Sequence, residues 1–385
     1  MAKVFRPERW DTPEFAVLVR CLEARWHPEA LEQARALIED DFDWDRLVDL
    51  AVGESVGPLL YAAVQGAGWV SSSVLSRLRR VYVLNGAQAA LRFHDLEAVL
   101  TALHEVGVPV IALKGAALAE TVYGNAALRP MDDADLLVPH AQGGDAVACL
   151  VALGYELFAP EARKGDALAY ENEVMLVRRE ERNLFQVELH WSLFDAPHYQ
   201  SALPMDWFWS TARPARIGGV ATQILGPEAQ LLHLCGHAVL HHGGAGGPPM
   251  RLCWLHDVAE VIFHYEEDIQ WDLLLARAQR CDLVLPVQML LPEIGELWNL
   301  DLPISFQGQL RSLVPSPAEV RVYAMLTGEP RPVLRRFVDD LRGFPSWRDR
   351  LTYAWHAVFP SPSYMGERYH VRSRWLLPMT YPYRW

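Results

Sequence analysis

Acidic residues crowd the start of a short apolar segment near the middle of the chain. The stretch from Arg129 to Pro139 reads RPMDDADLLVP, with three aspartates among and ahead of residues typical of a buried strand. Strand interiors disfavour aspartate, because an unpaired carboxylate away from water is costly. Acids at such a place therefore need a partner, and the usual partner is a cation.

The alternation of side chains along a strand divides these acids into two groups. Positions two apart point the same way, so Asp133 and Asp135 share one face, while the alternate positions are purely apolar and fit a core. Asp132 comes just before the strand, and we interpret it as a loop residue. Asp133 and Asp135 are thus expected to stand close together, facing solvent or a cleft.

A second segment, FQVELHWS, shows the same division further along the chain. Gln186, Glu188 and His190 fall on one face, and the other face is apolar. If the two strands pair, Glu188 joins the two aspartates, and carboxylates that converge in this way repel unless divalent cations neutralise them. Oxygen ligands with open positions favour Mg²⁺ or Mn²⁺, and two such ions about 4 Å apart can activate an attacking oxygen and stabilise a leaving phosphate.

Ordinary acids at strand ends, which cap loops or pair with arginine, are the alternative interpretation of these carboxylates. A single DxD pattern on one strand would favour that alternative. The matching parity of the second strand favours the metal site.

The elements that must position these residues can be predicted from periodicity. Apolar residues at three-to-four spacing indicate helices up to about residue 106, and the helical period returns from Pro227. Between them we expect a strand over 108–114, a helix over 115–123, the strand DADLLV, a helix over 145–153, the strand YELF, and two antiparallel hairpins that turn at Glu181-Arg182-Asn183 and at Gly218-Gly219.

These elements predict an α+β fold, in which a small mixed β-sheet core is flanked by N-terminal and C-terminal helical regions. The boundaries we expect are 1–95 for the N-terminal helical region, 96–225 for the core and 226–385 for a mainly helical C-terminal region. Past about residue 300 the pattern assigns little.

Composition restricts the partners and the compartment. Hydrophobic residues make up 51% and charged residues 22% of the 385 residues, a balance typical of a globular protein with a substantial core. The net charge of −13 argues against nucleic acid as a partner. The five cysteines are scattered, the first residues lack an apolar signal-like region, and no run of about 18 apolar residues follows, so we expect a cytoplasmic protein without a membrane partner.

Several motifs together resemble a known superfamily. LKGAAL, Tyr123, Arg129, DADLLV and VELHW resemble the nucleotidyltransferases of the DNA polymerase β-like superfamily, and in particular a poorly characterised bacterial branch. That branch continues with LLxLxxHxxxH and a W-L-x-D segment, found here as LLHLCGHAVLHH and as Trp254-Leu255-His256-Asp257. The resemblance covers about residues 95 to 275.

The resemblance implies an Mg²⁺-dependent nucleotidyltransferase with a two-metal mechanism, Mn²⁺ being the other suitable ion. Such an enzyme moves an NMP, expected to be AMP from ATP, to an acceptor and releases pyrophosphate. The metal ligands and catalytic residues would be Asp133, Asp135 and Glu188. The acceptor stays open, as a small molecule, a peptide or a protein.

The same resemblance places the nucleotide's phosphates at the start of a helix. Gly115 would open a helix whose free amides face the β- and γ-phosphates. Most superfamily members have Gly-Ser there, and this chain has Gly115-Ala116. Lys114 and Arg129 are expected to replace the missing serine as phosphate-binding cations. A solvated strand end for Lys114, and an ion pair of Arg129 with Asp132 or Asp133, are the alternatives.

Histidines supply further candidates and a rival hypothesis. His233, His237 and His241 lie at i, i+4 and i+8 of a predicted helix, on one face. His237 or His241 could face substrate over the cleft, and His190 could contact phosphate or support a metal ligand. Histidines that are satisfied within the core are the plainer interpretation.

With the His256-Asp257 pair, His233 and His237 also resemble an HD-type metal phosphohydrolase. A non-catalytic nucleotide-binding or regulatory protein of the same fold is the remaining alternative, which the missing serine favours.

Overall fold

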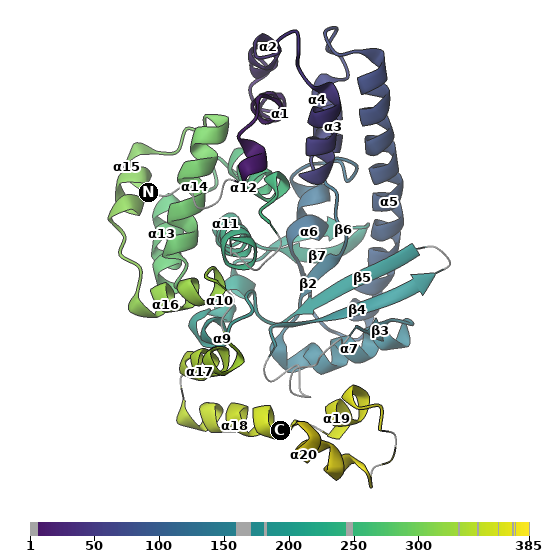
Figure 1. Cartoon of the computed structure of the whole chain (residues 1–385), viewed down its shortest axis with the longest axis vertical. Helices are drawn as coiled ribbons and strands as arrows, with labels where there is room; N and C mark the ends of the chain where they lie inside the picture. The colour runs from purple at the N-terminus through teal and green to yellow at the C-terminus, as the bar shows by residue number, and fades with distance from the viewer. Residues whose placement is uncertain are drawn as a thin grey trace.

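A mixed β-sheet lies at the centre of the chain and helices surround it, as the computed structural model shows (Figure 1). The structure describes residues 7–158, 171–180, 183–243, 249–329, 332–344, 346–360, 362–371, 373 and 375–384. The sheet has seven strands in the order β3-β4-β5-β2-β1-β7-β6. The strands are β1 (Ile111–Ala112), β2 (Ala134–Leu137), β3 (Glu156–Leu157), β4 (Glu173–Glu180), β5 (Asn183–His190), β6 (Arg213–Ile217) and β7 (Val220–Ile224). The expected α+β class is confirmed.

Both predicted hairpins form. Strands β4 and β5 pair antiparallel from Glu173–His190 to Glu180–Asn183, and residues 181 and 182 of the predicted turn lie outside the described residues. Strands β6 and β7 pair antiparallel about Gly218 and Gly219, whose φ angles of 55° and 79° are in the left-handed region that favours glycine. The hairpins extend the sheet on opposite sides of the central strands β2 and β1.

Strand β1 is shorter than the periodicity predicts. It spans Ile111–Ala112 instead of 108–114, because Lys114 already begins the helix α6 (Lys114–Thr121). Lys114 itself has a φ of 44°, which is unusual for a residue with a side chain and marks local backbone strain at the strand-to-helix turn.

Five main helices precede the sheet. They are α1 (Pro13–Glu23), α2 (Ala30–Ala36), α3 (Trp44–Gly53), α4 (Gly57–Val64) and the long α5 (Ser72–Glu105). Side-chain caps set where α1 and α3 begin, since Thr12 and Asp43 accept hydrogen bonds from the backbone N–H groups of Phe15 and Arg46 at 3.2 Å and 2.9 Å. α5 continues across residue 95, where we place the first domain boundary, and the three-part division of the chain stays a prediction.

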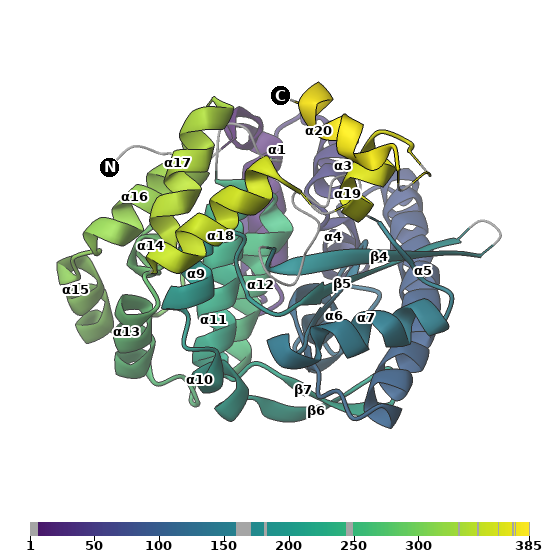
Figure 2. The same ribbon diagram turned by 90° about the horizontal axis from the view of Figure 1, so that it is seen from below.

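The second half of the chain is helical apart from β6 and β7. After α7 (Gly143–Ala152) and the short α9 (Pro197–Ala202) and α10 (Met205–Ser210), the main helices are α11 (Pro227–Gly236), η3 (His237–His241), α12 (Leu252–His264), α13 (Trp271–Arg280), α14 (Val284–Trp298), α15 (Ile304–Ser312), α16 (Pro317–Leu326), α17 (Val333–Gly343), α18 (Trp347–Val358), α19 (Pro362–Arg368) and α20 (Thr380–Arg384). Seen from below, α17 and α18 lie as an outer layer next to α9 and α16, and α19 and α20 lie apart from them at the upper right (Figure 2).

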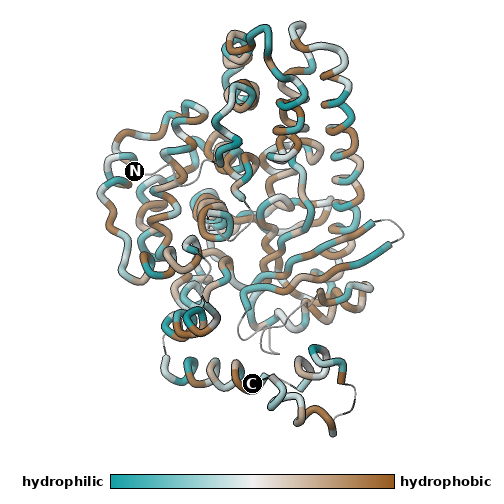
Figure 3. The backbone as a smooth tube through the Cα atoms, in the orientation of Figure 1, coloured by the Kyte–Doolittle hydropathy of each residue, from teal (hydrophilic) through white to brown (hydrophobic). Residues whose placement is uncertain are grey.

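Alternate residues of the central strands face two apolar clusters. Leu136 and Leu189 belong to a cluster that packs against α5 and α7. Leu137 belongs to a larger cluster, which joins α1, α3 and α4 to α11, α12 and α14. All ten residues of α11 are buried, and Figure 3 shows this helix as a mostly hydrophobic coil in the middle of the molecule. A helix that is apolar all round is typical of such a position.

The end of α11 is packed too tightly for any side chain. A Cβ atom on Gly236 would overlap the ring of the buried Phe194, whereas a Cβ atom on Gly308 in α15 would meet nothing within 4 Å. We predict that Gly236→Ala lowers the free energy of unfolding by about 1–3 kcal/mol, because the aromatic ring must move. Gly308→Ala, the matched control, should be neutral or stabilising by about 0.5–1 kcal/mol. Urea unfolding of both variants checks this, and equal effects would contradict the packing argument.

Candidate active site

The parallel pairing of β2 with β5 brings the predicted carboxylates together. In this register Asp135 lies opposite Glu188, and Leu137 lies opposite His190. Residues that oppose each other in a pair of strands present their side chains on the same face of the sheet. The parity deduced from the sequence is therefore present in the fold for Asp135, Glu188 and His190.

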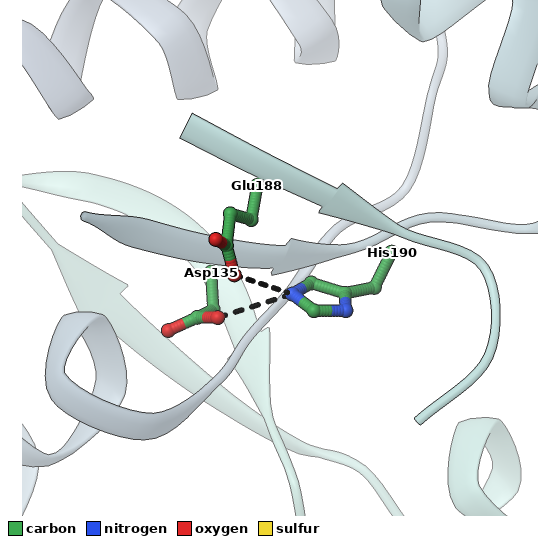
Figure 4. Close-up of side chains that lie close together, drawn as sticks. All are labelled: Asp135, Glu188 and His190. Atoms are coloured by element: carbon green, nitrogen blue, oxygen red, sulfur yellow. Dashed lines mark hydrogen bonds and ion pairs between the residues drawn. The ribbon is translucent and has the colours of Figure 1, made fainter. Parts of the chain in front are cut away.

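Asp135, Glu188 and His190 form the one group of potential metal ligands found among the described residues. One ligand atom from each lies within 4.8 Å of the others. The His190 Nε2 atom is 3.0 Å from an Asp135 carboxylate oxygen and 3.7 Å from a Glu188 oxygen (Figure 4). Asp133 precedes β2 and does not belong to this tight group, but it lines the same cavity.

Two further charged residues complete the cluster. The Lys114 ammonium group donates a hydrogen bond to Asp135 at 2.7 Å, and Glu173 on β4 lies 2.8 Å from the Nδ1 atom of His190. His190, which is buried, therefore bridges two carboxylates from different strands. It is placed to orient Asp135, as residues around metal ligands commonly do.

These contacts shift the pKa values in a consistent pattern. Burial alone would raise the pKa of Asp135, but Lys114 and His190 hold it well below its usual value. Burial would lower the pKa values of Lys114 and His190, yet the surrounding carboxylates raise both. For Asp133 the attraction of Lys114 does not offset burial and repulsion from Asp135 and Glu188, which together raise its pKa to about 7.

A cavity of about 410 Å³ opens beside this cluster. Of the residues predicted to bind nucleotide, Lys114, Gly115 and Arg129 line it, together with His237 and His241. Burial lowers the pKa of His237 well below its usual value and that of His241 to about 4, so both rings are neutral near pH 7. Ala116 is fully buried in the apolar cluster against α5 and α7 instead.

Arg129 lines the cavity but is held by a buried carboxylate. Its guanidinium donates two hydrogen bonds of 2.7 Å to Asp257 on α12, and both side chains are under 10% exposed. Tyr123 also donates to Asp257, at 2.8 Å, and its hydroxyl lies 3.0 Å from His256. Arg129 thus ties the loop before β2 to α12, and its partner is not the Asp132 or Asp133 considered from the sequence.

The same contacts bear on the HD-type alternative. An HD site needs His233, His237 and the His256-Asp257 pair to converge on a metal, and within the described ranges these residues do not form a ligand group. Asp257 instead neutralises Arg129, and His256 stacks against Trp26 from the N-terminal region.

Sequence reasoning missed four residues of the site. Glu173 could have been found, because the predicted hairpin register places it opposite His190. Arg251, Trp254 and His242 also line the cavity. They flank the Gly-rich loop between η3 and α12, and no periodicity in the sequence shows that the two ends of this loop meet at the cleft.

The carboxylate oxygens fit a divalent cation on chemical grounds. Asp135 and Glu188 offer oxygens within one small group. Burial and repulsion from neighbouring carboxylates raise the pKa values of Asp133 and Glu188, and a bound cation would relieve the repulsion. His190 is held as a cation between Glu173 and Asp135, so it fits an orienting role better than that of a ligand.

An α+β core whose neighbouring strands bring carboxylates to one cavity is the arrangement expected of a nucleotidyltransferase. The chain belongs to the family described as uncharacterised nucleotidyltransferase, whose model matches residues 40–299. Membership supports nucleotidyl transfer as the general reaction and a nucleotide as substrate. Proteins with this activity generally use divalent metal ions, and the cluster around Asp135 could bind one.

Two solved structures are similar in part. One is the solution structure of the antibiotic-resistance factor ANT(2'')-Ia, with 19% identity and a TM-score of 0.32 over 50% of this chain and 91% of that chain. The other is an antigenic nucleotidyltransferase-like protein from Paracoccidioides brasiliensis, with 15% identity and a TM-score of 0.34 over 56% of this chain and 95% of that chain. No curated protein matches the chain.

Within the described ranges every helix is too short or too polar to cross a bilayer.

The buried Arg129–Asp257 pair gives a stability prediction. We expect Asp257→Asn to lower the free energy of unfolding by about 3–5 kcal/mol, because it leaves the Arg129 charge buried without its counter-ion. Asp268→Asn removes the carboxylate of the exposed Arg213–Asp268 pair and should change stability by less than about 1 kcal/mol. Urea unfolding measures both variants. Similar small effects would mean that Arg129 is not held by Asp257.

The raised pKa of Asp133 gives a pH prediction for metal binding. Below about pH 7 this carboxyl group holds a proton that competes with a cation, so Mn²⁺ affinity should rise between about pH 6 and pH 8, by at most about tenfold per pH unit for each proton released. Titration of the protein with Mn²⁺, followed by electron paramagnetic resonance, measures this.

Variants separate the contributions to this pH dependence. Asp133→Asn should flatten the pH dependence and Asp135→Asn should weaken binding at every pH. Asp49→Asn, a change at an exposed position on α3 that does not line the cavity, should do neither. An affinity that is independent of pH in the wild-type protein would contradict the assignment of Asp133.

Proposed function

We propose that this protein is a nucleotidyltransferase that uses Mg²⁺ or Mn²⁺ to move an NMP from an NTP to an acceptor, with ATP as the expected donor. The observation that carries the proposal is the β2–β5 register, which sets Asp135 opposite Glu188 at the wall of a cavity. Asp133, at the entrance to β2, adds a third carboxylate to that wall. All five cysteines are free thiols, which fits a reducing cytoplasm.

The chain's own residues have distinct tasks in this reaction. Asp133, Asp135 and Glu188 would hold divalent cations, which when bound stabilise negative charge on the reacting phosphate and its leaving group. His190 keeps the Asp135 carboxylate oriented and ionised through its 3.0 Å contact. Lys114 donates to Asp135, and a cation held by that carboxylate would compete with the ammonium group and free it to approach a phosphate.

The bond changes of the transfer follow from the products. An acceptor oxygen forms a bond to the α-phosphorus while the bond from that phosphorus to the bridging β-oxygen breaks, and pyrophosphate leaves in line with the attack. The acceptor's proton passes to solvent. The cavity would hold the acceptor oxygen, the α-phosphorus and the leaving oxygen in line. Because both reactants are then already positioned, the reaction no longer depends on their random encounter in solution. A small molecule, a peptide or a protein side chain could supply the oxygen.

A non-catalytic nucleotide-binding protein is the second candidate, and two observations favour it. Ala116 is buried in the core, where relatives in the superfamily place a phosphate-binding serine, and Arg129 is occupied by Asp257. Such a protein would bind NTP in the same cavity and release no pyrophosphate over a long incubation. Calorimetry combined with a pyrophosphate assay separates the two candidates.

Transfer of label from α-labelled NTPs tests the proposal. The protein is incubated with each NTP, Mg²⁺ or Mn²⁺, and pools of candidate small-molecule, peptide and protein acceptors. We expect label in an acceptor and release of pyrophosphate, and Asp135→Asn should lower the rate by at least about a thousandfold, because a metal ligand that acts on the transition state is lost.

The control lies outside the site. Asp49→Asn should retain the wild-type rate, since Asp49 is 78% exposed and does not line the cavity. Label from a γ-labelled NTP should appear in pyrophosphate and not in the acceptor. Transfer that survives in Asp135→Asn would remove the metal argument.

A further inference from the structure

The cations around the cavity differ in whether a carboxylate already neutralises them. Lys114 is paired with Asp135 and Arg129 with Asp257. Arg251 lines the same cavity and makes no ion pair with any residue in the described ranges. Among the described residues, its side chain contacts the Ser55 hydroxyl, at 3.4 Å, and the face of Trp254, at 5.7 Å from the ring centre.

The backbone on both sides of Arg251 is fixed by the N-terminal helical region. The buried Glu54 accepts a hydrogen bond from the backbone N–H of Leu252 at 2.7 Å, and its carbonyl accepts from that of Cys253 at 3.2 Å. On the other side, Arg9 donates to the carbonyl of Met250. An arginine without a counter-ion is therefore held at a set place on the cavity wall, on a rigid helix start. Such pre-organisation is typical of a binding residue.

Histidine rings extend this wall. His242 stacks on Trp254 with ring centres 3.7 Å apart, and the ring of His237 meets Trp254 edge-on at 5.7 Å. The Nε2 atoms of His237 and His242 are 3.4 Å apart, so the two rings form a hydrogen-bonded pair that lines the same cavity as Arg251. The π-helical turn η3 produces this arrangement, because it brings residues five apart onto one side, and such turns are frequent at functional sites.

The lining of the cavity is complementary to a metal-bound phosphate group. Asp133, Asp135 and Glu188 bring negative charge to the cavity, and Arg251 with the ring nitrogens of the histidines brings a cation and polar groups to it. We propose that Arg251, His237 and His242 form a phosphate-binding subsite of this cavity. The sequence suggested phosphate binding for Arg129, but Asp257 neutralises that arginine, and in this proposal Arg251 binds the phosphate instead.

The phosphate group could belong to either reactant, a distinction that rests on the proposed nucleotidyl transfer. It would be the β- and γ-phosphates of the NTP, or an anionic group of the acceptor. A guanidinium group binds both in the same way, through parallel N–H···O hydrogen bonds. Anion binding itself does not depend on turnover, so it can be measured whether or not the transfer reaction is found.

Calorimetric titration with inorganic pyrophosphate, with and without Mg²⁺, tests the subsite. We expect Arg251→Gln to raise the dissociation constant about 10- to 100-fold, the loss typical of a charged hydrogen bond. Arg251→Lys should recover part of the affinity, because the charge returns without the planar fork. Arg77→Gln, which removes an arginine exposed on the N-terminal helices, should bind as the wild-type protein does.

A competition experiment identifies the source of the phosphate. If a non-hydrolysable NTP analogue displaces pyrophosphate and loses affinity in Arg251→Gln, the subsite holds the β- and γ-phosphates. If phosphate still binds in the presence of saturating analogue, and only the wild-type protein binds it, the subsite belongs to the acceptor. Pyrophosphate binding that is absent in the wild-type protein, or unchanged in a folded Arg251→Gln variant, would overturn the proposal. Thermal unfolding confirms that the variants are folded.

Discussion

The parallel register between β2 and β5 is the constraint on which the site depends. It sets Asp135 beside Glu188, and the same register places Leu136 beside Leu189 on the other face, inside the cluster against α5 and α7. A slip by one residue would turn the carboxylates into the apolar cluster and the leucines toward the cavity, so apolar packing fixes the polar geometry. Any other register would place charged groups in the apolar cluster, which costs free energy, so this register is favoured over its neighbours.

The carboxylate of Asp257 neutralises one arginine of the cavity, Arg129, and leaves the other, Arg251, without an ion pair among the described residues. It lies 2.7 Å from two nitrogen atoms of Arg129 and joins the loop before β2 to α12, so the charge of Arg129 stabilises the fold and is not free for a ligand. The start of α12 is fixed in turn by Glu54 from the N-terminal region. Both walls of the cavity are therefore positioned by contacts between segments that are distant in sequence, which is why the helical regions are needed for a site whose carboxylates come from the sheet.

Features of the fold and the site that depend on residues close together in sequence could be predicted, and those that depend on distant residues could not. Strand parity is local, so the shared face of Asp135, Glu188 and His190 followed from counting residues, and so did both hairpins. The length of β1 did not, because the positive φ of Lys114 ends the strand early and nothing in the residue types signals it. The partner of Arg129 lies 128 residues away in sequence, and several nearer acids were equally plausible on charge alone. Charge alone identifies candidate partners for an arginine, and the fold determines which of them forms the ion pair.

The charges of the cluster also limit how metal ions could be shared between protein and nucleotide. Asp133, Asp135, Glu173 and Glu188 are four carboxylates, and Lys114 and a protonated His190 balance two of them. The remaining two negative charges match one divalent cation. A second cation would leave the cluster with net positive charge unless phosphate oxygens accompanied it. A two-ion reaction here would thus require that the nucleotide bring the second ion, and Arg251, which lines the same cavity, would then offset the phosphate charge that remains.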